Sequence, residues 1–210
     1  GSGCTASGAA LREGGDVQDG RFSASDGTLM AGSQDITPFK DGVRGLRHGS
    51  LVGLTQLKRE VIPRFSLQLD EYARGLVQSF ENADATLSPG EPGLFTDNGL
   101  AFDPLNSVGL ASRLRLNDKV SLSGDGEVWR IRDGLGATEP GPASDSSQVV
   151  LFVEALANPV GADPDTGIPT QIDLKSFAAE MIASQASERA RSQNDFNAAS
   201  SAAEVVMAAR

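Results

Sequence analysis

The sequence contains one cysteine, Cys4, and one histidine, His48, in 210 residues. One cysteine cannot form a disulfide within the chain, and this pair cannot supply the usual tetrahedral zinc sites. Gly, Thr and Ala surround Cys4 and do not activate a thiol, so we expect a small unpaired side chain. His48 precedes a predicted helix without an evident acid or nucleophile partner, so we expect an exposed loop histidine rather than a catalytic base.

Long apolar runs, aromatic residues and nucleotide-binding motifs are also scarce. No apolar run reaches the roughly 18 residues that a membrane span needs, so we expect no contact with a membrane. With aromatics at 5%, one Trp and one Tyr, there is little to build sugar-binding platforms. The P-loop, dinucleotide and serine-hydrolase motifs are absent. We therefore predict a protein that is not an enzyme, with no catalytic, cofactor-binding or metal-binding residues.

The net charge of −10 is concentrated in the middle of the chain. Residues 85–170 hold 12 acids and 5 bases, a balance of −7. The three remaining stretches, 1–49, 50–84 and 171–210, carry a net charge of −1 each. An acidic region argues against nucleic-acid binding, which needs clustered Lys and Arg. Asp163, Asp165 and Gly167 repeat part of a calcium loop, but the third ligand and the later Glu of that loop are missing, so calcium is not favoured.

The stretch Ser50–Asp84 organises the rest of the sequence. Its apolar residues follow steps of three and four, which is one face of an α-helix: Leu54, Leu57, Val61, Phe65, Leu69, Tyr72, Leu76 and Phe80. At 1.5 Å per residue, about 35 residues extend roughly 50 Å, too long for a small compact domain to cover. We expect this face to be core between long helices, or partly a surface that packs against neighbouring subunits. Ser50 is the expected N-cap.

Pro63 lies in the middle of this helix. It lacks an N–H and its ring clashes with the carbonyl four residues earlier. The sequence therefore predicts a kink or break near Arg59–Ile62.

A second long helix is predicted at about 173–209, with Asp173 as its N-cap. Its first turns and its last turns carry apolar residues, whereas its middle is rich in Ala, Ser and Gln. Such a middle permits close helix approach or marks a face that needs a partner.

The remaining segments read as loops, short strands and one short helix. The pattern of residues 1–48 predicts a small β-rich module with a hairpin at Asp26-Gly27. Residues 85–146 are expected to form a loop-rich insertion. Alternating apolar residues suggest a strand over Arg113–Leu122. Trp129 is the expected core anchor beneath the loops. Ser147–Leu156 predicts a short helix buried against the long one.

Together these elements predict an α+β fold. Long antiparallel helices would form a helical rod domain over residues 49–210, beside the β-rich module of residues 1–48. Gly1–Gly3 look like a tag remnant, and we expect the chain to be a fragment of a longer protein that is monomeric in isolation.

The first long helix also carries a family resemblance. Residues 49–80, GSLVGLTQLKREVIPRFSLQLDEYARGLVQSF, resemble the G-x-L-x-G-L-x-x-x-R-D-x-x-x-P…L-D-x-L-A segment of the flagellar hook-associated protein 1 family. Arg59-Glu60 stands where the family has Arg-Asp. Weaker similarities cover TASGAALREG at 5–14, the Leu94-Phe95 stretch, WRIRDG at 129–134 and the C-terminal helix.

This resemblance implies a structural axial protein of the bacterial flagellum that joins the hook to the filament. Implied partners are the hook protein, the second junction protein, further copies in the assembled flagellum and an export chaperone for the full-length protein. The resemblance also implies an extracellular location, which the protein reaches by type III export without a cleaved signal peptide. Two alternatives stay open: another axial protein (flagellin or the second junction protein) and an extracellular cell-wall hydrolase.

Overall fold

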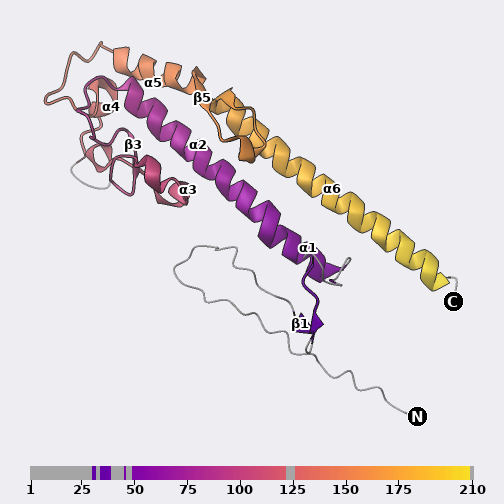
Figure 1. The fold of residues 1–210 in the computed structure, drawn as a ribbon. Helices are drawn as coiled ribbons and strands as arrows, with labels where there is room; N and C mark the ends of the chain where they lie inside the picture. Colours follow the sequence, from indigo (N-terminus) through magenta and orange to yellow (C-terminus); the bar gives the residue numbers. More distant parts are fainter. Residues whose placement is uncertain (1–29, 32–33, 39–44, 46–48, 122–125, 209–210) are drawn as a thin grey trace. The chain divides into compact units, whose positions relative to one another are not determined.

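The computed structural model describes residues 30–31, 34–38, 45, 49–121 and 126–208, and most of these are helical (Figure 1). The chain divides into two compact units, Gly1–Phe65 and Ser66–Arg210. In the first unit, β1 (Met30–Ala31) pairs with β2 (Gln34–Asp35) in antiparallel fashion. Most of the predicted β-rich module, with Cys4, Asp26-Gly27 and His48, lies outside the described residues, so the division at residue 48 stays a prediction.

Helix runs from Ser50 to Ala83, one residue short of the predicted end. It consists of α1 (Ser50–Gln56), the π-helical turn η1 (Leu57–Val61) and α2 (Ile62–Ala83). The N-cap prediction for Ser50 was wrong by one residue, because Gly49 takes that position with a φ of 104°, which favours glycine. A break near Arg59–Ile62 is not present, because the helix continues through η1 into α2. The predicted kink stays a prediction, and the π-helical turn lies just before Pro63.

From Ser66 onward, α2 is packed on two sides. One side carries Gln68, Glu71 and Gly75, and the other carries Ala73, Val77 and Phe80, all of them buried. Gly75 allows close approach, since a Cβ there would lie 3.1 Å from Leu174 and 3.3 Å from Val160.

The first side of α2 contacts a hairpin and the start of the last helix. The hairpin is β5 (Pro159–Gly161) paired with β6 (Gln171–Asp173), with the 3-10 turn η4 (Pro164–Thr166) between them. Ala162, Ile168, Ile172 and Phe177 form a core cluster here, with Tyr72 and Met181 packed against it. Helix α6 (Leu174–Ala208) runs antiparallel to α2, because Tyr72 meets Phe177 while Gly75 meets Leu174.

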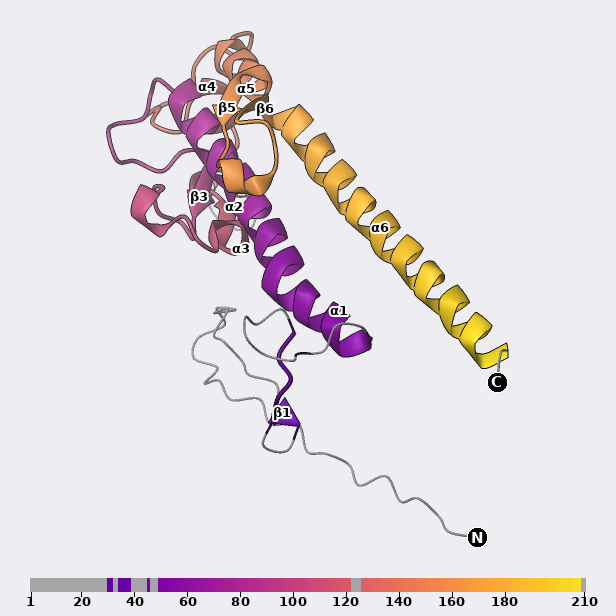
Figure 2. The same ribbon diagram turned by 45° about the vertical axis from the view of Figure 1, so that its right-hand side comes forward.

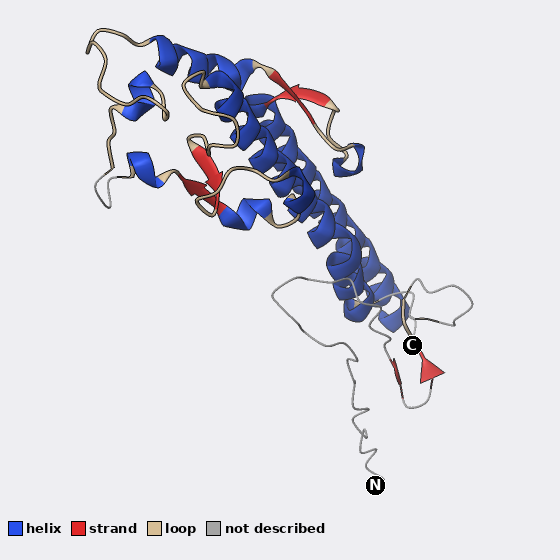
Figure 3. Cartoon of the chain, turned by 60° about the vertical axis from the view of Figure 1, so that its left-hand side comes forward, coloured by secondary structure: helices blue, strands red, loops and turns tan. Residues whose placement is uncertain are grey.

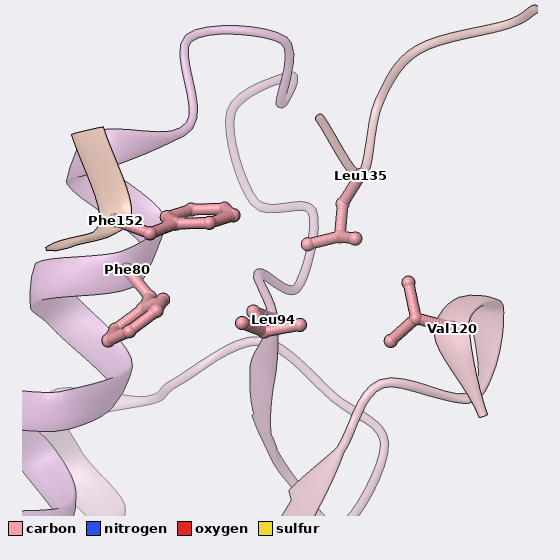
Figure 4. Close-up of a cluster of buried hydrophobic side chains, with 5 residues drawn as sticks. All are labelled: Phe80, Leu94, Val120, Leu135 and Phe152. Atoms are coloured by element: carbon pink, nitrogen blue, oxygen red, sulfur yellow. The ribbon is translucent and has the colours of Figure 1, made fainter. Parts of the chain in front are cut away.

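The second side of α2 is covered by the segment 94–157. Its elements are β3 (Phe95–Asp97), η2 (Pro104–Asn106), α3 (Leu110–Arg113), β4 (Leu114–Leu116), η3 (Asp118–Val120), α4 (Arg130–Asp133) and α5 (Ser147–Ala157). Strands β3 and β4 pair in antiparallel fashion. A second core cluster joins these elements to the end of α2: Phe80, Leu94, Val120, Leu135 and Phe152 (Figure 4).

Two sequence predictions in this segment were wrong. Arg113–Leu122 is not one strand: within its described residues, 113–121, the strand β4 covers Leu114–Leu116 and lies between α3 and η3. Trp129 is not the core anchor. It is half-buried, with the Arg130 guanidinium 4.6 Å from its ring centre, and Leu135 fills the core instead.

The second unit is thus mostly helical with small antiparallel sheets, broadly α+β as predicted (Figures 2 and 3). Asp173 does cap α6, since its Oδ1 accepts a hydrogen bond from the Ser176 N–H at 2.9 Å. The finer prediction of a rod domain stays a prediction.

Candidate functional site

The acidic side chains of α2 and the loops hold backbone rather than forming a reactive cluster. Asp70 accepts hydrogen bonds from the N–H groups of Gly109 at 2.7 Å and Ala111 at 2.9 Å, at the start of α3. It thereby satisfies amides that a short helix leaves unpaired at its N-terminus. Both carboxylate oxygens of Asp70 are engaged in this way, which gives the residue a structural role.

Asp84 performs a similar task at the end of α2. Its Oδ2 accepts from the Leu135 N–H at 2.7 Å, and its Oδ1 accepts from the N–H and the hydroxyl of Thr86 at 3.0 and 2.6 Å. Thr86 Oγ1 in turn accepts from the Gly136 N–H at 2.9 Å. Asp84 and Leu135 are both buried, so this network fixes a loop residue in the core 51 positions along the chain.

The hairpin side of α2 is tied by three side chains one helical turn apart. Gln68 Nε2 donates to the Thr166 carbonyl at 2.8 Å, and Glu71 Oε2 accepts from the Asp163 N–H at 3.0 Å. Arg74 forms an ion pair with Glu71 and also donates to the Gly161 carbonyl. These buried or half-buried contacts pin the β5–β6 hairpin to α2.

Asp163, the first residue of the partial calcium motif, has a structural role in the turn between β5 and β6. Its Oδ1 accepts from the Asp165 N–H at 2.8 Å and caps η4, while Gly167 has a φ of 71° and ends the turn. This is an Asx-type turn built from the same residue types. Across the described ranges, no three His, Cys, Asp or Glu side chains are grouped so that they could hold a metal ion.

Arg113 and Asp97 form a two-pronged ion pair, with Nε–Oδ1 at 2.7 Å and Nη2–Oδ2 at 2.9 Å. The hydrogen bonds to Asp97 raise the pKa of the Arg113 guanidinium above its usual range. The same guanidinium donates to the carbonyls of Asn106 and Val108. The pair therefore closes the loop 98–112 onto β3, which is again a structural task.

Glu81 is an α2 carboxylate whose burial opposes its charge. Burial raises the pKa of Glu81, although backbone hydrogen bonds from Phe102 and Gly93 lower it in part. Its Oε1 is buried and has no hydrogen-bond partner. The group packs tightly, because a Cβ on Gly93 would lie 2.8 Å from Glu81 Cγ. Burial and two backbone amides, rather than a charged side chain, therefore set the pKa of Glu81.

The surface feature that stands out is the outer part of α6. Only Leu174 and Phe177 are buried in this 35-residue helix. At about 100° per residue, the face that carries Leu174, Phe177 and Met181 continues outward. There it carries Phe196, Ala199, Ala203 and Val206, all exposed, with Phe196 at 66% and Val206 at 63%. We call these four residues the outer α6 face; it lies on the yellow end of the helix in Figure 1.

The first long helix also exposes apolar residues. Leu54 is 60% exposed, and Leu57, Ile62 and Leu69 are exposed as well. The prediction that the whole stripe is core was therefore wrong for Leu54, Leu57 and Leu69. Tyr72, Leu76 and Phe80 do reach the core clusters. The alternative prediction, that part of this stripe is available to partners, is compatible with this exposure.

Helix α5 was expected to be buried, and this prediction was wrong for most of its apolar residues. Phe152 and Ala155 are buried, but Val149, Val153 and Leu156 share an adjacent face and are exposed, as are Val150 and Leu151. The exposure could have been predicted from the run Val149-Val150-Leu151-Phe152-Val153. Five consecutive apolar residues surround a helix, so one packed side cannot cover all of them.

Among the described residues, no helix is both long and apolar enough to cross a membrane. No family model, no curated protein and no solved structure matches the chain.

Proposed function

We propose that this chain is the outward-facing core of an axial structural protein of the bacterial flagellum, which joins the hook to the filament. The resemblance of residues 49–80 to the hook-associated protein 1 family supports this assignment. The proposal includes an extracellular location reached by type III export, with contacts to the hook protein, the second junction protein and further copies of the chain. The predicted helical rod domain belongs to the same proposal.

One observation carries the proposal: the outer α6 face. Most of the stability of a helix in a protein comes from packing of an apolar face against other elements. Helix α6 is packed at its start, and further along it exposes Phe196 and Val206, which lie about two to three turns apart. Such a helix suits a subunit that packs against other helices. The exposed residues Leu54 and Leu57 have the same character.

The use of the acids favours a scaffold over a hydrolase. Asp70, Asp84 and Glu71 each accept hydrogen bonds from backbone amides of another segment. A glycoside hydrolase needs two carboxylates that face one scissile bond. Carboxylates committed to backbone amides are poor candidates for that role.

The first test is electron microscopy of cells deleted for the full-length gene, with flagellin assayed in the medium. The proposal predicts bare hooks and flagellin lost to the medium. Normal filaments would refute it. Hooks without filaments but with no secreted flagellin would instead favour flagellin itself, and activity of the purified protein on a peptidoglycan zymogram would favour the cell-wall hydrolase.

A matched pair of variants tests the outer α6 face in the same cells. Phe196→Glu places a charge on that face, whereas Ser201→Glu places the same charge on the opposite side of the helix. Both positions are exposed, so neither change should unfold the protein. We expect Phe196→Glu to fail to restore motility and Ser201→Glu to restore it. Equal complementation by both variants would remove the support that α6 gives to the proposal.

A further inference from the structure

The π-helical turn η1 and Pro63 form a discrete element, which we call the joint (residues 57–63). Pro63 cannot donate a hydrogen bond to the Arg59 carbonyl, and its ring needs space on that side of the helix. The chain accommodates it with one wide turn, in which the Ile62 N–H donates to the Leu57 carbonyl, five residues back. Such π-turns are uncommon in α-helices and recur at functional positions.

The joint is not fixed by a packed core. No residue of η1 is buried, and Lys58, Arg59 and Glu60 are all exposed. By contrast, α2 carries Gln68, Ala73 and Val77 at no more than 2% exposure a few residues later. Backbone hydrogen bonds that are exposed to water and lack a buried neighbourhood open at lower free energy than those in a core.

The joint also occupies a particular place in the chain. The two compact units meet in sequence at Phe65 and Ser66, two residues after Pro63. Each unit is one continuous stretch of sequence, so the helix that contains the joint is the single covalent connection between them. The joint lies near the end of the first unit, so a change in the direction of the helix there leaves every element of the second unit intact.

From these three observations we infer that the joint is a hinge: the helix bends at Leu57–Pro63 while α2 beyond Ser66 stays rigid. The wide turn can exchange between hydrogen bonds four and five residues apart, and the missing proline N–H removes the bond that would hold a straight helix. Kinks at prolines and at π-turns have this physical origin. The inference does not depend on the flagellar assignment.

Distances between spin labels test the hinge directly. In a Cys4→Ser background, Gln56→Cys and Asn82→Cys place labels on either side of the joint, 26 residues or roughly 39 Å apart along a straight helix. Ser66→Cys and Asn82→Cys form the matched control pair, roughly 24 Å apart within α2. All three label positions are exposed.

We expect a broad distance distribution for the pair that spans the joint and a narrow one for the control pair. Pro63→Ala restores the missing N–H, so it should narrow the spanning distribution and slow amide hydrogen exchange at Leu57–Ile62 severalfold. Ser66→Ala, a nearby exposed change that leaves all N–H groups in place, should alter neither. Two results would overturn the inference. In the protein with Pro63, the spanning pair would give a distance distribution as narrow as that of the control pair. Alternatively, Pro63→Ala would leave the spanning distribution unchanged.

Discussion

Replacing Asp84 by alanine is the change that most directly tests how α2 organises the second unit. The carboxylate accepts three hydrogen bonds, one from the Leu135 N–H and two from Thr86. Leu135 is fully buried and belongs to the core cluster with Phe80 and Phe152. Asp84→Ala removes the acceptor and leaves a buried N–H without a partner.

The expected cost follows mainly from the Leu135 amide. A hydrogen bond to a charged group contributes about 1.5–3 kcal/mol, and an unpaired buried donor costs about 1–3 kcal/mol. Thr86 is exposed, so water can replace its two bonds at little cost. We therefore expect Asp84→Ala to lower the free energy of unfolding by about 2–4 kcal/mol.

Urea unfolding followed by fluorescence of Trp129, the single tryptophan, measures this loss close to the site. Far-UV circular dichroism reports the helices in the same titration. Asp84→Asn is the matched control. Its amide oxygen can still accept from the Leu135 N–H. Its NH₂ group can donate to the Thr86 hydroxyl but also faces the Thr86 N–H, which is a second donor, so we expect a loss smaller than that of Asp84→Ala. If Asp84→Ala unfolds within about 0.5 kcal/mol of the parent protein, the network does not hold the core and the reasoning is wrong.

Three further changes probe other parts of the second unit. Phe177→Ala should lower the free energy of unfolding by about 3–5 kcal/mol, because the ring is fully buried. Phe196→Ala, on the exposed part of the same helix, should lower it by under about 0.5 kcal/mol. Equal losses in thermal or urea unfolding would contradict the burial pattern. Glu81→Gln should raise the free energy of unfolding at pH 7, because a folded-state pKa above the usual value of 4.5 means that the charged carboxylate opposes folding. The gain over the parent protein should vanish in acid and grow as the pH rises through 4.5. A difference in stability that does not depend on pH would count against this reasoning. Gly134→Ala should destabilise by at least about 1–3 kcal/mol, since φ is 103° and a Cβ would collide with Thr86; a neutral effect in the same urea assay would show that the corner can relax.

The two long helices could be predicted from sequence because their apolar residues recur every three or four positions. Pro63 likewise indicated an irregular helix just before it, since no other residue type lacks the N–H, but the sequence did not predict that the irregularity would be a π-helical turn. The exposure of Leu54 and Leu57 could not be read from that pattern. Periodicity identifies the face that seeks a partner, but it does not say whether the partner lies in the same chain.

The first side of α2, which contacts the β5–β6 hairpin, escaped the sequence pattern for a different reason. It is built from Gln68, Glu71 and Gly75, which are not apolar, and it is held by hydrogen bonds to the β5–β6 hairpin. The tasks of Asp70 and Asp84 were invisible too, because their partners are backbone amides about 40 and 50 positions away. Such pairings depend on the tertiary fold rather than on local composition.

The central claim is that the outer α6 face contacts other subunits in an assembled flagellum. The most direct measurement places a photoreactive amino acid at position 196 of the full-length protein in living cells, with position 201 on the opposite side of α6 as the control. Irradiation of assembled flagella should cross-link position 196 to another axial subunit, identified by mass spectrometry, and leave position 201 largely unlinked. Equal yields at the two positions, or no intermolecular product from position 196, would contradict the account.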